Sequence, residues 1–398
     1  MTFQNRSLVH VYFVGSDLKC QVGRLAYKER KIFFEYDSEF IKLGLQLSPF
    51  KLPLQVGVIS STDHLFDGLF GVFHDSLPDG WGRLLLDRKL VKLGLNLGAI
   101  SPLDRLCFVG SRGMGALRYE PENQENSLSD WQDLDIIAEE IRGFQEGDQD
   151  RFVEDLFHLG GSSSGVRPKI LISIGGKDWI IKFRSYTDPT DMGNIEYAYH
   201  LMAREAKLDL PEAKLFRSRR GPGYFGVKRF DRRKGNPIHM HTISGLLHAD
   251  HRLPSLDYRA IMRTTWYLTR DVRQCEKQFR AAVFNIAAHN RDDHAKNFSF
   301  LMDAEGSWFV SPAYDLTFAH GPGGEHCTMI MGEGKEPKLS HLLQLANVGG
   351  IKKSKATEII DEVRTSISKW NLFAEIAKVK SSSRKMIQKA LSQREWGK

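Results

Sequence analysis

The sequence has few cysteines and no long apolar run. Its four cysteines are spread over 398 residues without a Cys-x-x-Cys pair, so neither a disulfide framework nor a zinc site is expected. No run approaches the roughly 18 apolar residues that a membrane helix requires. The first residues, MTFQNRSLVHVYFVG, lack the basic region, apolar block and cleavage site of a signal peptide. These absences predict a cytoplasmic protein that does not enter a membrane.

Several motifs of ordinary eukaryotic kinases and of Walker-type nucleotide-binding proteins are missing as well. The chain contains no His-Arg-Asp or Asp-Phe-Gly motif. The segment VGSRGMGALRYEP is rich in glycine, but no Gly-Lys-Ser/Thr follows it, so it is not a Walker loop. We interpret its glycines, Gly110, Gly113 and Gly115, as tight-turn residues.

Length and composition are those of an ordinary globular protein. The 398 residues, 41% hydrophobic and 26% charged, suffice for two or three domains with buried cores. The net charge is +7, and residues 351–398 hold 12 Lys or Arg against 5 Asp or Glu. This basic surplus is either a solvated face of C-terminal helices or a surface for nucleic acid or an acidic partner.

The order of periodic segments predicts three parts. Residues 1–122 contain short alternating and apolar runs typical of a small β-rich domain, which ends at a polar linker. Residues 123–235 contain a predicted hairpin over 169–183, a helix over 194–208 and a further strand pair. Residues 236–398 are predominantly helical. The sequence therefore predicts an α+β, bilobal protein-kinase-like fold: a β-rich N-lobe and an all-helical C-lobe, with an extra small β-rich N-terminal domain.

The most informative stretch is AHNRDDHAKNFSFLMDAEGSWFVSPAYDL. It places Asp292 and Asn297 five residues apart, and Asp315 follows a short strand-like segment. One Asp that takes a hydroxyl proton, with an Asn and a second Asp that hold magnesium, is the working set of a protein-kinase site. Asp293 competes with Asp292 for the role of base, but the five-residue spacing to Asn297 favours Asp292.

Two further residues of this stretch are candidates for the catalytic loop. His294 is expected to organise the loop, and Lys296 is a candidate for neutralising the transferred phosphoryl group.

Residues upstream supply the remaining parts of such a site. The run GGSSSG, over 160–165, precedes the predicted hairpin and can form a backbone cradle for phosphate. Lys182 lies in an apolar strand, where its ammonium group needs an anion, and Glu196 on the next helix is the natural carboxylate to orient it. The segment 228–230 follows a strand, in a position that suits a hinge binding adenine through its backbone.

A cluster of four histidines has spacings that occur in metal sites: His239, His241, His248 and His251. No acidic or cysteine partner is arranged around it, and a helix is expected to begin near 242–244. We therefore do not expect these histidines to form a metal site.

Together these motifs resemble the HipA-type serine/threonine kinases, the toxin components of bacterial toxin–antitoxin pairs. LPDGWGR and VGSRGMGAL are similar to the N-terminal domain of that family, and GGSSSGVRPK to its phosphate loop. KRFDR, HNRDDHAKNFSFL and SPAYDL are similar to its hinge, catalytic loop and metal-binding motif. The resemblance extends almost from end to end of the chain.

The resemblance implies a role for each matching residue. Asp292 is the implied base, with Lys182, His294 and Lys296 as further catalytic residues, Glu196 as the orienting residue, and Asn297 and Asp315 as the ligands of Mg²⁺. The implied ATP contacts are Ser164, Gly165, Val166, Arg167, Pro168, Lys169, Lys182, Lys228, Arg229, Phe230, His294, Asn297, Tyr314 and Asp315. The implied autophosphorylation site is Ser162, with Ser164 as the alternative.

The family also implies partners. A small helix-turn-helix antitoxin would bind the kinase and carry it to operator DNA, and the substrate would be an aminoacyl-tRNA synthetase. Two alternatives remain open from the sequence. One is a kinase-shaped corepressor that acts mainly through the antitoxin, and the other is a kinase of small molecules or lipids.

Overall fold

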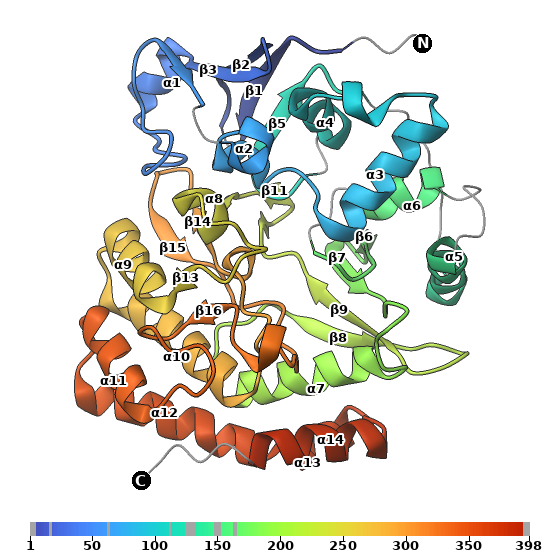
Figure 1. The fold of residues 1–398 in the computed structure, drawn as a ribbon, viewed down its shortest axis with the longest axis vertical. Coiled ribbons are helices and arrows are strands. Elements are labelled where there is room, and N and C mark those ends of the chain that lie inside the picture. Colours follow the sequence, from blue (N-terminus) through green and yellow to red (C-terminus); the bar gives the residue numbers. More distant parts are fainter. Residues whose placement is uncertain are drawn as a thin grey trace.

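The computed structural model describes residues 5–15, 18–61, 64–110, 113–123, 133–146, 153–161 and 165–392. Figure 1 shows an N-terminal sheet at the top of the molecule, a second sheet at mid-height and a layer of C-terminal helices at the bottom. No helix in these ranges is both long and apolar enough to cross a membrane.

The N-terminal domain is built on a five-stranded antiparallel sheet with the strand order β4-β3-β2-β1-β5. Its strands are β1 (Leu8–Val14), β2 (Lys19–Lys28), β3 (Lys31–Tyr36), β4 (Val58–Ser60) and β5 (Leu117–Glu120). Every second residue of β1 is buried, as expected for a strand with one face on a core. The helices of this domain are α1 (Ser38–Leu43), α2 (Gly71–His74), α3 (Gly80–Lys92) and α4 (Pro102–Val109).

The second sheet is antiparallel and has the order β6-β7-β9-β8. Its strands are β6 (Lys169–Ile174), β7 (Lys177–Lys182), β8 (Ala213–Phe216) and β9 (Tyr224–Lys228), accompanied by α5 (Leu134–Glu146), α6 (Val153–Gly160) and α7 (Met192–Glu205). Gly175 and Gly176 both have positive φ angles in the turn between β6 and β7, which confirms the predicted hairpin. Helix α3 of the N-terminal domain shares a core with α6 and this sheet, so the two parts are packed together.

Helices dominate the C-terminal half, and they pack around one large core. They are α8 (Ile243–Leu247), α9 (Tyr258–Thr269), α10 (Val272–Ala287), α11 (Leu339–Val348), α12 (Lys353–Ser368), α13 (Trp370–Ile376) and α14 (Ser381–Ser392). Short strands accompany these helices in three small sheets. Two of the sheets are strand pairs: β10 (Arg232–Arg233) with β11 (Asn236–Pro237), and β13 (Leu256–Asp257) with β16 (Thr328–Met329). The third sheet consists of β12 (His239–Thr242), β14 (Ser299–Met302) and β15 (Trp308–Val310). The predicted fold class holds, with these small sheets added to the helical lobe.

The four clustered histidines join the C-terminal half to the N-terminal domain. Each histidine ring contacts a group of that domain. His239 lies 3.0 Å from the Leu47 carbonyl, and His241 lies 2.6 Å from the Asp75 carboxylate. His248 accepts a hydrogen bond of 3.1 Å from the Gly71 N–H, and His251 lies 4.0 Å from the Asp79 carboxylate. In the part of the chain that the structure describes, no group of three or more His, Cys, Asp or Glu side chains is arranged to hold a metal. Contact between domains therefore accounts for the histidine spacing.

Candidate active site

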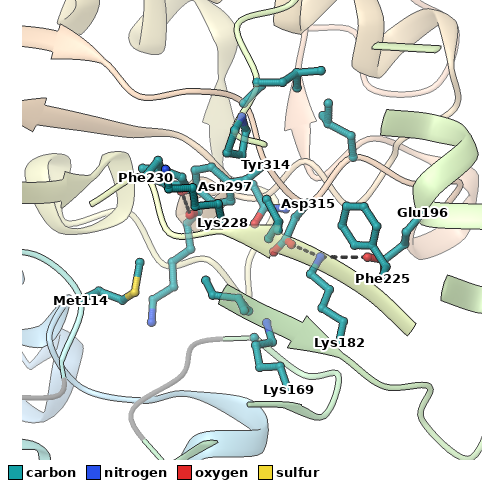
Figure 2. A pocket seen from close by; sticks show the side chains of 18 of the residues that line it. Met114, Lys169, Lys182, Glu196, Phe225, Lys228, Phe230, Asn297, Tyr314 and Asp315 are labelled. Atoms are coloured by element: carbon teal, nitrogen blue, oxygen red, sulfur yellow. Dashed lines mark hydrogen bonds and ion pairs between the residues drawn. The ribbon is translucent and has the colours of Figure 1, made fainter. Parts of the chain in front are cut away.

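A cavity of about 130 Å³ lies where the second sheet, the C-terminal half and the N-terminal domain meet (Figure 2). One set of its lining residues is apolar and includes Leu171, Ile180, Val227, Phe230 and Leu316. The other set is charged and includes Lys169, Lys182, Glu196, Lys296 and Asp315. An apolar surface beside a group of cations suits a ligand that has a flat ring and an anionic tail.

Lys182 is the last residue of β7, and its ammonium group lies between two carboxylates. Nζ is 3.1 Å from Oε2 of Glu196 and also bonds to Oδ1 of Asp315, as the dashed lines of Figure 2 show. Burial alone lowers the pKa of Lys182, but the charges of Asp315 and Glu196 outweigh it and raise that pKa above its ordinary value. Lys182 is therefore a fixed cation at the cavity.

Glu196 is held in place by its position on α7. Only 3% of its side chain is exposed, and Arg167 lies 3.5 Å from the oxygen that does not contact Lys182. Arg167 is itself fixed by two hydrogen bonds to Asp188, of 3.0 and 3.1 Å. The carboxylate thus has a cation on each side, and it can orient Lys182 as the sequence predicted.

Asp315 and Lys169 complete the charged region. Burial favours a protonated Asp315, but the ammonium groups of Lys182 and Lys169 hold its pKa well below the usual range. Burial in turn lowers the pKa of Lys169, and the charge of Asp315 opposes that shift. Gly165, at φ +101°, lies so close to Lys169 that an added Cβ would be 2.5 Å from its Nζ. The positive φ angle favours glycine at this position.

The catalytic loop follows α10, and it separates the two neighbouring aspartates. Asp293 is fully buried and accepts hydrogen bonds from the Tyr258 hydroxyl (2.9 Å) and the Thr328 N–H (3.3 Å), and it pairs with His326 (2.9 Å). Asp292 is exposed. The side chain of Asp293 therefore anchors the loop, which leaves Asp292 as the carboxylate that can meet a substrate.

The pKa of Asp292 lies above the ordinary value of an aspartate. Desolvation of the carboxyl group raises this pKa. The charge of His294 opposes the shift, and the charge of Asp315 adds to it. Its carbonyl accepts a hydrogen bond of 2.7 Å from the amide nitrogen of Asn297. That bond fixes Asn297 and leaves its amide oxygen as the atom that can bind a cation.

Asn297 and Asp315 fit magnesium by the chemistry of their donor atoms. An amide oxygen and a carboxylate oxygen are hard ligands, and Mg²⁺ is usually held by one or two protein oxygens, with water and phosphate oxygens completing the octahedron. Both residues line the cavity.

Tyr314 and Phe230 form the aromatic part of the cavity. Their ring centroids are 5.3 Å apart, and the Tyr314 hydroxyl donates to the Lys296 carbonyl at 2.6 Å. Lys228 also lines the cavity, but Arg229 turns away and pairs with buried Asp231 at 2.7 Å. The expected hinge residues are therefore split between the cavity and the junction with the N-terminal domain.

The structure brings most of the predicted site residues to one place. Those that line the cavity are Gly165, Lys169, Lys182, Glu196, Lys228, Phe230, His294, Lys296, Asn297, Tyr314 and Asp315. Val166, at 82% exposure, faces solvent, and Arg167 acts through Glu196. Ser162 and Ser164 lie outside the described residues.

Four functional candidates escaped the sequence analysis. Asp75, Asp79 and Met114 reach the cavity from the N-terminal domain. Asn290 donates to Oδ1 of Asn285 (2.9 Å) and to the Asp315 carbonyl (3.3 Å), and so connects the predicted catalytic loop to the predicted metal-binding motif. For Asp79 a signal existed, because an aspartate in a Pro-Asp-Gly turn ahead of a helix is a common capping residue. Nothing in the sequence marked Met114.

Fold and cavity together define a bilobal, protein-kinase-like architecture with an added N-terminal domain. Two family models match the chain: the HipA N-terminal domain over residues 18–120 and the HipA-like C-terminal domain over residues 161–370. Because the second match alone covers more than half of the 398 residues, the chain belongs to the HipA family.

Two known proteins show how far the similarity extends. HipA of Shewanella oneidensis MR-1, solved in a complex with HipB and operator DNA, has a TM-score of 0.69 and 17% identity, over 97% of this chain and 95% of that one. This likeness shows a shared fold. A protein of Sinorhizobium fredii named "Putative kinase Y4dM" is 24% identical over 218 residues, which are 51% of this chain. The match spans about half of that relative, 53% of its length.

Proposed function

We propose that this protein is an ATP- and Mg²⁺-dependent serine/threonine protein kinase and the toxin of a toxin–antitoxin pair. The observation that carries the proposal is that Lys182, Glu196 and Asp315 meet His294, Lys296 and Asn297 at one cavity. Phosphoryl transfer depends on positioned phosphates and neutralised charge, and this set of residues supplies both.

The proposed reaction uses the residues in the following way. Lys182 and Lys169 attract the phosphates of ATP, and the adenine lies between the apolar strand residues and Phe230. Asp292 orients the substrate hydroxyl and accepts its proton as oxygen attacks the γ-phosphorus. ADP leaves with the electron pair of the broken bond, and Lys296 neutralises charge on the transferred group. Mg²⁺ held by Asn297 and Asp315 would neutralise the phosphate oxygens.

We also propose the partners and substrate that the family implies. A small helix-turn-helix antitoxin would bind this chain and place it on operator DNA, and the complex of the Shewanella protein with HipB and operator DNA supports this. The substrate would be an aminoacyl-tRNA synthetase in the cytoplasm. Autophosphorylation of Ser162, or of Ser164, would place about two negative charges just before Gly165, where ATP phosphates are expected.

Mass spectrometry of the purified protein incubated with ATP, Mg²⁺ and a lysate tests the proposal. We expect phosphate on a loop serine and on one or a few lysate proteins, and neither in Asp292→Ala or Asp315→Ala. Wild-type protein that binds ATP but transfers nothing, while it still represses an operator together with its antitoxin, would support the corepressor function instead. Phosphorylated small molecules or lipids without any phosphoprotein would favour the remaining alternative.

A further inference from the structure

The turn formed by 78–80 of the N-terminal domain reaches into the cavity, and both carboxylate oxygens of Asp79 are engaged there. Oδ2 accepts a hydrogen bond from Nζ of Lys296 at 2.6 Å, and Oδ1 accepts one from the N–H of Gly165. Lys296 belongs to the predicted catalytic loop, and Gly165 belongs to the predicted phosphate loop. One side chain of the N-terminal domain thus connects the two loops on which the proposed reaction depends.

The same turn holds Gly165 from its other side. The N–H of Trp81 donates to the carbonyl of Gly165 at 3.0 Å, so both backbone polar groups of Gly165 are bound by residues of one turn. Gly80 lies between these two contacts at φ +44°, and an added Cβ would be 2.5 Å from the Gly165 oxygen. This close approach fixes the position of Gly165 in the phosphate loop.

A purely local role for Asp79 does not explain these contacts. Asp79 is the N-cap residue of α3, a position where an aspartate side chain usually accepts a hydrogen bond from its own helix. Its side chain makes no such bond, and it faces the cavity instead. Burial favours the protonated acid, but Lys296 and the Gly165 N–H hold the pKa of Asp79 at about 2. The carboxylate is therefore charged at neutral pH.

Lys296 in turn depends on Asp79 for its position. Only 7% of the lysine side chain is exposed, so its flexible stem is held in one place. A lysine ammonium is a point charge whose effect on a transferred phosphoryl group depends on where it lies.

We propose that Asp79 is a positioning residue for phosphoryl transfer, which holds the ammonium group of Lys296 at the catalytic loop and fixes Gly165 of the phosphate loop. This inference rests on the proposed kinase function. In this proposal, a residue of the N-terminal domain contributes to phosphoryl transfer.

The first test is the kinetics of Asp79→Asn. The amide oxygen can still accept from Gly165, but the neutral side chain no longer holds the charge of Lys296. We expect kcat to fall by about tenfold or more while KM for ATP changes by less than about threefold, because the adenine surface and Lys182 are untouched. A residue that only stabilised the fold would lower the thermal midpoint and leave kcat of the folded protein unchanged.

A double variant tests whether Asp79 acts through Lys296. In Lys296→Met the partner is already lost, so adding Asp79→Asn should lower kcat by less than about twofold more. His239→Ala is the matched control, since it removes a buried contact with Leu47 at the same domain junction away from the cavity. We expect it to lower the thermal midpoint and leave kcat unchanged.

The outcomes separate this inference from the proposal on which it rests. If the wild-type protein neither binds ATP nor transfers phosphate, the kinase function itself fails. If the wild type is active, three results would each overturn the role of Asp79 alone: an unchanged kcat in Asp79→Asn, multiplied losses in the double variant, or an equal loss of kcat in His239→Ala.

Discussion

The ammonium group of Lys182 lies 3.1 Å from the carboxylate of Glu196, and both side chains are buried between β7 and α7. Each group would be costly to bury without an opposite charge. Their pairing sets the position of a cation at the cavity, and it leads directly to the first prediction.

Glu196→Gln should reduce phosphoryl transfer. The neutral amide leaves Lys182 paired with Asp315 alone, which draws the ammonium toward the metal-binding residue. We expect kcat/KM for ATP to fall by about 10- to 100-fold, equal to about 1.4 to 2.8 kcal/mol of transition-state stabilisation. Glu205→Gln is the control, because Glu205 lies on the same helix in an exposed pair with Lys369. Equal losses in both variants would contradict the orienting role.

Substitution of Asp292 should mainly reduce activity, and substitution of Asp293 should mainly reduce stability. Asp292→Asn should lower transfer by about 10²- to 10⁴-fold, the usual contribution of a general base, and leave the fold intact. Asp293→Asn should mainly destabilise the protein, by about 2 to 4 kcal/mol, because it disturbs a buried hydrogen-bond network. Denaturant unfolding and a transfer assay on each variant measure the two effects. A stable, inactive Asp293→Asn beside an active Asp292→Asn would reverse the assignment.

Gly80→Ala should destabilise the junction between the domains. The φ angle of +44° at Gly80 and its short approach to Gly165 both disfavour a Cβ atom. The free energy of unfolding should therefore fall by about 2 kcal/mol or more. Gly221→Ala is the control, because Gly221 has an ordinary φ and no atom within 4 Å of an added Cβ. Chemical denaturation of both variants decides the matter: equal stability would show that the turn adapts.

The stability of the protein should depend on pH through His239. Burial and the nearby His241 lower the pKa of His239 to about 3 from an ordinary value of 6.5. The unfolded chain thus binds a proton below pH 6.5 that the folded chain does not. The free energy of unfolding should therefore be highest above about pH 6.5 and fall by up to about 1.4 kcal/mol per pH unit from this residue as the pH drops toward 3.

His239→Gln checks that dependence. A plot of unfolding free energy against pH between 7.5 and 5 should be shallower in this variant than in the wild type. Other histidines with lowered pKa values, among them His74 and His200, keep part of the slope in both proteins. Identical slopes would show that His239 does not contribute.

The sequence predicted those features whose physical cause is local. The β6–β7 hairpin follows from two β-rich runs joined by a glycine-containing turn, and Asp292 and Asn297 are five residues apart on one loop. The candidate role of Lys182 follows from the cost of burying a lysine in an apolar strand. In each case neighbouring residues carry the necessary information.

The missed features depend on contacts between distant residues. Asp79 reaches Gly165 and Lys296, which are 86 and 217 positions away, and no periodicity or spacing connects such residues. The four histidines show the same limit, since their partners lie in the N-terminal domain. Asp292 and Asp293 differ only in burial, which the tertiary structure decides.

The cavity takes its lining from residues as far apart as Asp75 and Leu316, and this has a consequence for the protein while it is being made. A ribosome releases the N-terminal domain first, and that domain has an apolar core formed almost entirely by its own residues. Asp315 emerges only after the second sheet and the catalytic loop. Nascent chains, and fragments from early termination, therefore lack a complete form of the proposed ATP site. The proposed activity would therefore arise only in chains that are nearly fully synthesised.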